Sequence, residues 1–124
     1  MDVTTHDAAL AGDVLEDSAT GAAAAITATL AAAAGTRTRI SGFSVTGSGA
    51  TGASRVVVTV TGLTDTLSFV MTIPAGVTLA VVELKCHFDP PLPASADNTA
   101  IVVNVPSFGA GNTNAAVAAW GPRY

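Results

Sequence analysis

Cysteine, aromatic residues and charge are all scarce in this sequence. A single cysteine, Cys86, excludes an intrachain disulfide, so a small secreted fold held together by disulfides is ruled out. Charged residues make up 11% of the 124 residues and aromatic residues 5%, whereas charged residues make up about a quarter of a typical soluble domain. So little surface charge indicates a chain covered by neighbouring chains, with a sandwich kept soluble by threonine, serine and asparagine as the alternative.

Basic residues are missing from the start of the chain, since none precedes Arg37. Five of the nine acids lie there: Asp2, Asp7, Asp13, Glu16 and Asp17. From Ser18 onward, five basic residues minus four acids give +1, so the net charge of -4 comes from an acidic leader on a nearly neutral body. Nucleic acid is not an expected partner, because phosphate binding needs clustered cations.

Long apolar runs and export signals are also lacking. No stretch reaches the length of a membrane span, and no basic segment followed by an apolar one marks a signal peptide. There is no Asn-x-Ser/Thr acceptor site for glycosylation. The simplest expectation is a protein made in a reducing cytoplasm, with no membrane partner.

Residues that carry chemistry are few and badly spaced. The two histidines are His6, near the start, and His87, beside Cys86. Adjacent strand residues point to opposite faces, so Cys86 and His87 cannot easily bind one ion, and Cys86 is better interpreted as a small buried apolar residue. No serine nucleophile motif or glycine-rich phosphate loop occurs. We expect no enzyme activity, no metal or other cofactor and no small-molecule substrate.

What the sequence does contain is a series of short alternating runs after an acidic start. Residues 1–20 are predicted to form an N-terminal arm, in which Gly12 allows at most a short helix. Leu10, Val14 and Leu15 give this arm apolar side chains to bury against a neighbour. The alternative is a frayed terminus.

Residues 21–124 are predicted to form one all-β domain, a two-sheet antiparallel β-sandwich or jelly-roll-like fold of about seven strands. The Ala-rich segment 22–30 also fits a helix, but its alternating threonines favour a strand. The expected strands are 22–30, 37–45, 55–61, 66–73, 77–88, 99–105 and 114–120.

Three local features refine these strands. Ile40 is out of phase with Phe43 and Val45, so Gly42 is predicted to mark a bulge. The alternation also changes phase near Val81, where a bend would let one strand serve two sheets. The prolines of segment 89–97 exclude a central strand there, because they remove backbone donors.

The C-terminal segment concentrates residue types that are typical of protein interfaces. Trp120, Arg123 and Tyr124 lie within five positions, and such residues contribute most of the binding energy in many contacts. We expect them to form an interface. The alternative is that Trp120 caps the core and Tyr124 is a loose end.

Several segments resemble small structural proteins of tailed bacteriophages. The similarity covers roughly residues 22–121, leaves the acidic arm unmatched and consists of turn-and-strand patterns. The segments that carry it are Ile40-Ser-Gly-Phe-Ser-Val-Thr, Val56-Val-Val-Thr-Val-Thr-Gly, Ile73-Pro-Ala-Gly-Val, Pro91-Leu-Pro-Ala-Ser-Ala-Asp-Asn-Thr-Ala-Ile-Val-Val-Asn-Val-Pro and Gly109-Ala-Gly-Asn-Thr-Asn-Ala-Ala-Val.

The resemblance is to capsid decoration proteins, which implies a virion protein that stabilises the head by bridging capsomers. Its partners would be copies of itself, with a trimer favoured, and the major capsid protein. It would assemble in the cytoplasm of the bacterial host. A receptor- or glycan-binding module of a tail fibre or spike, or a tail or connector component, is the alternative. Removing residues 1–20 is expected to weaken attachment and leave the fold intact.

Overall fold

The computed structural model of the chain describes residues 13–76 and 81–124. These residues form eight strands, one more than the sequence predicts. They are β1 (Asp13–Gly21), β2 (Ile26–Leu30), β3 (Arg39–Ser48), β4 (Ser54–Thr61), β5 (Leu67–Ile73), β6 (Val81–Pro93), β7 (Ile101–Val105) and β8 (Ala115–Arg123).

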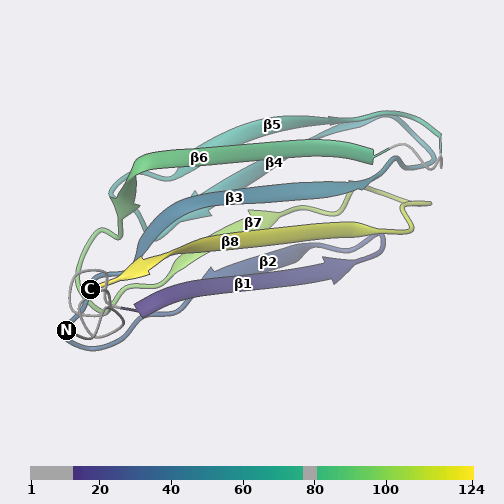
Figure 1. The fold of residues 1–124 in the computed structure, drawn as a ribbon. Helices are drawn as coiled ribbons and strands as arrows, with labels where there is room; N and C mark the ends of the chain where they lie inside the picture. The colour runs from purple at the N-terminus through teal and green to yellow at the C-terminus, as the bar shows by residue number, and fades with distance from the viewer. Residues whose placement is uncertain (1–12, 77–80) are drawn as a thin grey trace.

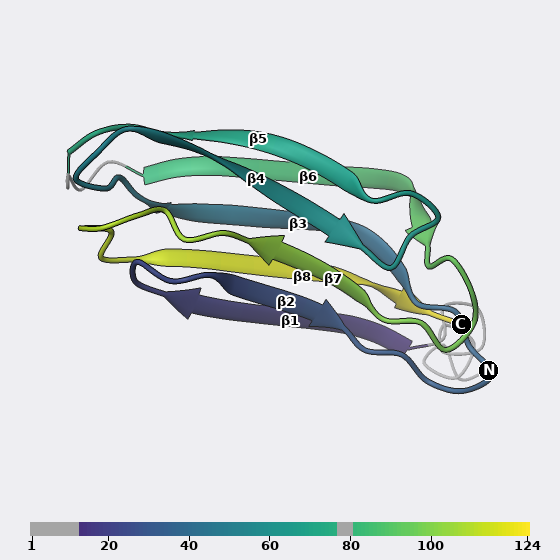
Figure 2. The ribbon, with the colours of Figure 1, turned by 180° about the vertical axis from the view of Figure 1, so that it is seen from behind.

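The strands form two four-stranded antiparallel sheets packed face to face, which confirms the predicted sandwich. The front sheet has the order β1-β8-β3-β6 and faces the viewer in Figure 1. The back sheet has the order β2-β7-β4-β5 and faces the viewer in Figure 2. Segment 22–30, for which a helix was the alternative, contains strand β2.

This strand order is that of a jelly roll. The chain behaves as one long hairpin, in which β4 pairs with β5, β3 with β6, β2 with β7 and β1 with β8. Rolling that hairpin up places successive pairs alternately in the back and front sheets. Residues far apart in sequence therefore lie side by side, as Asp13 and Arg123 do.

The additional strand is β1, which the sequence analysis did not predict. Residues 13–20 lie in the sandwich rather than in an arm, because β1 pairs along its whole length with β8. The side chains of Leu15 and Ala19 turn inward and pack against the core. Residues 1–12, the rest of the predicted arm, lie outside the described residues.

The core lies between the sheets and follows the alternation of the strands. β2 and β7 bury every second residue, and so does β8 as far as Gly121. The largest fully buried side chains are Phe43, Phe108, Leu30, Ile40, Ile73 and Ile101, followed by a group of valines. Burying such aliphatic side chains contributes about 1.5–3 kcal/mol each, so this alternation largely defines the fold.

The predicted irregularities in β3 and β6 are present in part. The pairing of β3 with β6 shifts between Ile40 and Gly42, which confirms a bulge at this point. A Cβ added to Gly42 would lie 2.6 Å from the Cys86 carbonyl oxygen, so only glycine fits there. β6 continues beyond the predicted end at Phe88 through three prolines to Pro93, which is possible because it is an edge strand. Residues 77–80, next to the predicted bend, lie outside the described residues.

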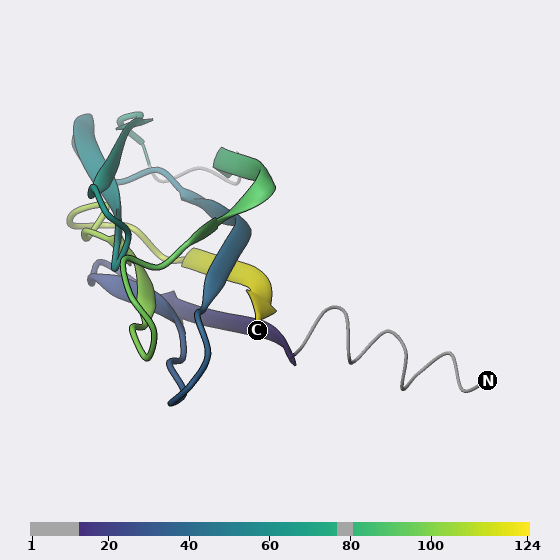
Figure 3. The same ribbon diagram turned by 90° about the vertical axis from the view of Figure 1, so that its left-hand side faces the viewer.

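The two lateral sides of the sandwich differ, as the end-on view of Figure 3 shows. On the closed side, β1 lies against β2, and the backbone N–H of Thr29 donates to the Asp17 carboxylate at 2.8 Å. On the open side, β5 and β6 touch only sparsely. The inward side chains there are half-buried: Leu67 and Phe69 on β5, and Val82, Leu84, Cys86 and Phe88 on β6.

Candidate functional site

The outer surface of the front sheet, called here the front face, is lined by small side chains along three neighbouring strands. Antiparallel register places outward residues of β1, β8 and β3 in rows across the sheet. One row contains Thr20, Ala116 and Thr46, and the next contains Ser18, Ala118 and Ser44. Because none of these side chains is long, the middle of the face is low and open to contact.

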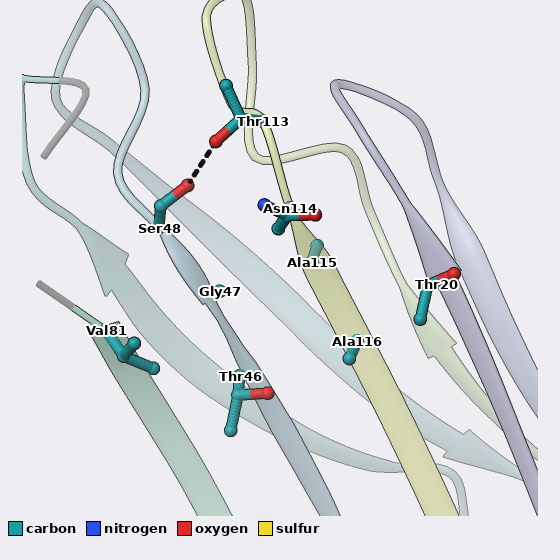
Figure 4. Close-up of a pocket in the computed structure, with 9 residues that line it drawn as sticks. All are labelled: Thr20, Thr46, Gly47, Ser48, Val81, Thr113, Asn114, Ala115 and Ala116. Carbon is teal, nitrogen blue, oxygen red and sulfur yellow. Dashed lines mark hydrogen bonds between the residues drawn. The ribbon is translucent and has the colours of Figure 1, made fainter. Parts of the chain in front are cut away.

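A hollow of about 310 Å³ lies at the end of the front face nearest Thr113. Figure 4 shows Thr20, Ala116 and Thr46 on three strands, with the hydroxyls of Ser48 and Thr113 3.2 Å apart above them. The lining residues include no titratable side chain. The hollow therefore offers methyl groups and hydroxyls, which suits docking of another surface rather than acid–base chemistry.

Trp120 lies on the front face, so it does not cap the core. Its neighbours across the sheet are Glu16 on β1 and Gly42 on β3, and His87 follows on β6. The rings of Trp120 and His87 meet edge to face with centroids 5.8 Å apart. A Cβ on Gly42 would lie 2.9 Å from the Trp120 ring, so the glycine leaves room for the indole to lie across β3. The indole remains partly exposed.

Arg123, an expected interface residue, makes its contacts within the chain. Its guanidinium lies 2.8 Å from the Asp13 carboxylate and donates to the Ala31 carbonyl at 3.3 Å. Its side chain is 17% exposed. These contacts fasten the end of β8 to β1 and to the segment after β2.

Tyr124 is not a loose end, although it is 52% exposed. Its backbone pairs in both directions with Arg37. The Arg39 guanidinium lies 3.8 Å from the centre of its ring and donates to its carbonyl at 3.0 Å. The Arg37 Nε lies 3.3 Å from the Asp97 carboxylate without a hydrogen bond, and both side chains are exposed, so this ion pair contributes little.

The remaining interface candidates, Leu10, Val14 and Leu15, are not brought together on one surface of the described residues. Val14 is 77% exposed on the front face, next to Pro122 in the register. Leu15 points the other way, into the sandwich. Leu10 lies outside the described residues. The structure thus brings Val14 and Trp120 to one face and separates them from Leu15.

Cys86 and His87 point to opposite faces, as predicted. Cys86 packs against the core, and burial raises the pKa of its thiol above the ordinary value of 9.0. Within residues 13–76 and 81–124, no three His, Cys, Asp or Glu side chains gather closely enough to hold a metal ion. No helix in the same residues is long and apolar enough to span a membrane.

Two features were not predicted from the sequence: an exposed valine pair on the back sheet and a buried asparagine in the loop before β8. Val57 and Val70 are exposed and lie opposite each other on the outer face of the back sheet. Their position out of phase with the core residues was the available signal. Asn112 is almost fully buried, and its amide donates to the carbonyls of Ser48 and Asn114, both at 2.9 Å. Its loop composition gave no sign of this.

Comparison with known proteins adds no identification: neither the protein-family profiles nor the curated proteins contain a match to this chain.

Proposed function

We propose that this protein is a non-enzymatic structural component of a bacteriophage virion, which decorates and stabilises the capsid as an oligomer. The front face is the surface that docks on the capsid. The observation that carries this proposal is the position of Trp120, which lies across Gly42, in a row with Glu16 and His87 and beside rows of alanine, serine and threonine. Tryptophan is prominent among the residues that dominate binding energy in protein contacts.

The surroundings of Trp120 suit a docking surface. The rows beside it are uncharged over β1, β8 and β3, so covering them costs little desolvation. Arg123 and Tyr124 hold the end of β8 through contacts within the chain, which keeps the strand carrying Trp120 in place. A surface that is rigid before binding loses little conformational entropy when it docks.

The virion setting rests on the resemblance of segments 40–46, 56–62, 73–77, 91–106 and 109–117 to phage structural proteins. The jelly-roll order is compatible with it, since viral capsid domains have this topology. Lectin domains share the topology, so the fold alone does not select one function. On a capsid lattice, many weak contacts add up to firm attachment, which fits a small chain with a modest docking face.

Copy number in purified particles tests this function. Quantitative mass spectrometry of virions should give the protein in a fixed, high ratio to the major capsid protein. A few copies per particle would instead support the fibre, spike or connector alternative, and absence from virions would refute both.

Substitution of Trp120 tests the docking face. Trp120→Ala should reduce capsid occupancy strongly, whereas Thr27→Ala, an exposed position on the outer face of the back sheet, should not change it. Equal occupancy of the two variants would exclude the front face as the docking surface. Both variants should keep the wild-type melting temperature closely enough for the comparison to hold.

A truncation tests the acidic arm separately. The deletion should end at residue 12, because residues 13–20 belong to β1 and removing them would expose the core. Deleting residues 1–12 should weaken attachment and leave the melting temperature close to that of the whole chain. Unchanged occupancy would remove the arm from the mechanism.

A further inference from the structure

A sheet edge is a template for another strand, and three of the four edge strands in the described residues carry features that discourage pairing. β1 has three acids along its length: Asp13, Glu16 and Asp17. β2 is only five residues long and is covered by β1, with Asp17 accepting a hydrogen bond from the Thr29 N–H. β6 contains charged residues and three prolines. Each of these is a known protection against association through edges.

β5 is the fourth edge strand, and its seven residues have none of these protections. The sequence Leu67-Ser-Phe-Val-Met-Thr-Ile73 contains no charge, proline or glycine. Its register with β4 continues without a bulge from end to end. In the described residues, β4 is its only paired neighbour, so its other edge presents free backbone donors and acceptors.

We propose that β5 is the docking site for a second copy of this chain, which adds its own β5 antiparallel across a two-fold axis at Val70. This inference deepens the proposed function, because it rests on assembly as the protein's activity and names one contact of that assembly. The two back sheets then join into one continuous sheet, and each chain covers the unprotected edge of the other.

The chemistry of β5 is symmetric about Val70, which is the argument for a copy of the same strand. Pairing centred there places Ser68 opposite Thr72 of the second copy, a hydroxyl pair. It places Leu67 opposite Ile73 of the second copy and Phe69 opposite Met71 of the second copy, giving an aliphatic pair and a sulfur–aromatic pair. No like charges meet anywhere along the contact.

The same pairing covers the exposed apolar residues of this region. Val70 is 65% exposed and Val57, its neighbour on β4, is 44% exposed. With the two-fold axis at Val70, the four valines of the two chains form one continuous row across the joined sheet. The contact also brings the half-buried Leu67 and Phe69 of the open side next to the second chain. Pro74 follows Ile73 directly and limits the ladder to these seven residues.

A two-fold contact gives dimers, or larger assemblies built from dimers, rather than the trimer favoured by the resemblance. Light scattering on the purified full chain at about 100 μM, where a micromolar contact is nearly saturated, should give the mass of a dimer. Val70→Lys should raise the dimer dissociation constant at least about tenfold, because it sets two like charges directly opposite each other. The matched control is Val14→Lys, an exposed valine on edge strand β1, which should leave the dimer unchanged.

A charge exchange tests the register. At a protein concentration between the dissociation constant of the wild-type dimer and those of the single variants, Val70→Lys alone and Val70→Glu alone should both be largely monomeric, and an equimolar mixture of the two should recover the dimer. Only a contact in which position 70 faces position 70 predicts this recovery. The recovery also shows that both variants are folded.

Three results would overturn the β5 contact: a monomeric wild-type chain at this concentration, an oligomer that Val70→Lys does not weaken, or a mixture that stays monomeric. If the wild-type chain is monomeric but Val70→Lys loses its place on particles, β5 pairs with a capsid strand and the second-copy proposal is wrong. The proposed function is judged separately by copies per virion, so a monomeric chain present at high copy number would refute only the contact.

Discussion

The two lateral sides of the sandwich cover the core between the sheets to different extents. At the closed side, β1 and β2 bring the layers together, and the Asp17 carboxylate binds a backbone donor of β2. At the open side, β5 and β6 stay apart and leave apolar side chains half-buried. In the part of the chain that the structure describes, the core is thus complete at one side and incomplete at the other.

Stability and association are therefore expected to depend on different sides of the sandwich. Residues at the closed side are already surrounded by their own chain, so substitutions there act on folding. Among residues 13–76 and 81–124, nothing further covers the side chains at the open side, so substitutions there are expected to act more on assembly. Substitutions on the two sides can test this division.

Replacing a leucine by alanine should lower the free energy of unfolding more at the closed side than at the open side. Leu30 on β2 is 1% exposed, and Leu30→Ala should lower the free energy of unfolding by about 3–4 kcal/mol through lost burial and a cavity. Leu84 on β6 is half-buried, and Leu84→Ala should cost about 1–2 kcal/mol. Urea unfolding in a Val70→Lys background measures both without a dimer. Equal costs would contradict the division.

The buried side chain of Asn112 connects the turn between β1 and β2 to the ends of β3 and β8. Its side chain accepts from the Ala23 N–H in the turn between β1 and β2 at 3.1 Å, and it donates to two carbonyls beside β3 and β8. Asn112→Ala should cost about 2–3 kcal/mol, because it leaves buried polar groups without partners. Asn114→Ala is the control, since that side chain is exposed. Urea unfolding measures the free energy of unfolding of both variants. A similar decrease in both would show that the buried amide of Asn112 makes no special contribution.

The hydrogen bond from β2 to Asp17 should have a smaller effect. Asp17→Ala removes the acceptor of the Thr29 N–H and should cost about 1 kcal/mol, because both groups can bind water once separated. Glu16→Ala, one residue earlier on the opposite face of β1, should change stability less. Faster amide hydrogen exchange at Thr29 in the Asp17 variant alone would locate the effect. Unchanged exchange there would exclude this bond as a tie between the layers.

The smallest effect concerns Cys86 at the open side. Because burial raises the pKa of its thiol above 9.0, the folded state holds this proton more firmly than the unfolded state does. The resulting stabilisation is present below about pH 9 and is lost as pH rises through the higher folded pKa. The melting temperature of the wild-type chain should therefore fall slightly more between about pH 8 and 10.5 than that of Cys86→Ala. Parallel curves would show that the thiol is no more buried folded than unfolded.

Much of the fold could be predicted from local alternation. The inward sets Leu67, Phe69, Met71 and Ile73 on β5, and Val82, Leu84, Cys86 and Phe88 on β6, face the core as their period of two requires. The bulge at Gly42 was also predictable, because Ile40 and Phe43 are three apart and both are buried. In each case the signal lies within a few residues.

What could not be predicted depends on residues that are distant in sequence. β1 has a weak strand pattern, and it forms because β8 pairs with it from the other end of the chain. The ion pair of Asp13 with Arg123 joins residues 110 positions apart, so composition suggested an arm and an interface instead. Asn112 could not be distinguished from other loop asparagines, because two of its partners, Ala23 and Ser48, lie 89 and 64 positions away in the sequence.

The all-β class and the inward side chains of each strand follow from local alternation alone, because side chains alternate across a strand whatever its neighbours are. Which strands become edges, which of those edges are protected, and the position of Trp120 on an outer face follow from the packing of the whole domain. These properties depend on which strands pair with each other. Strand pairing is set by contacts between segments that are far apart in the sequence, so a local sequence pattern does not reveal it.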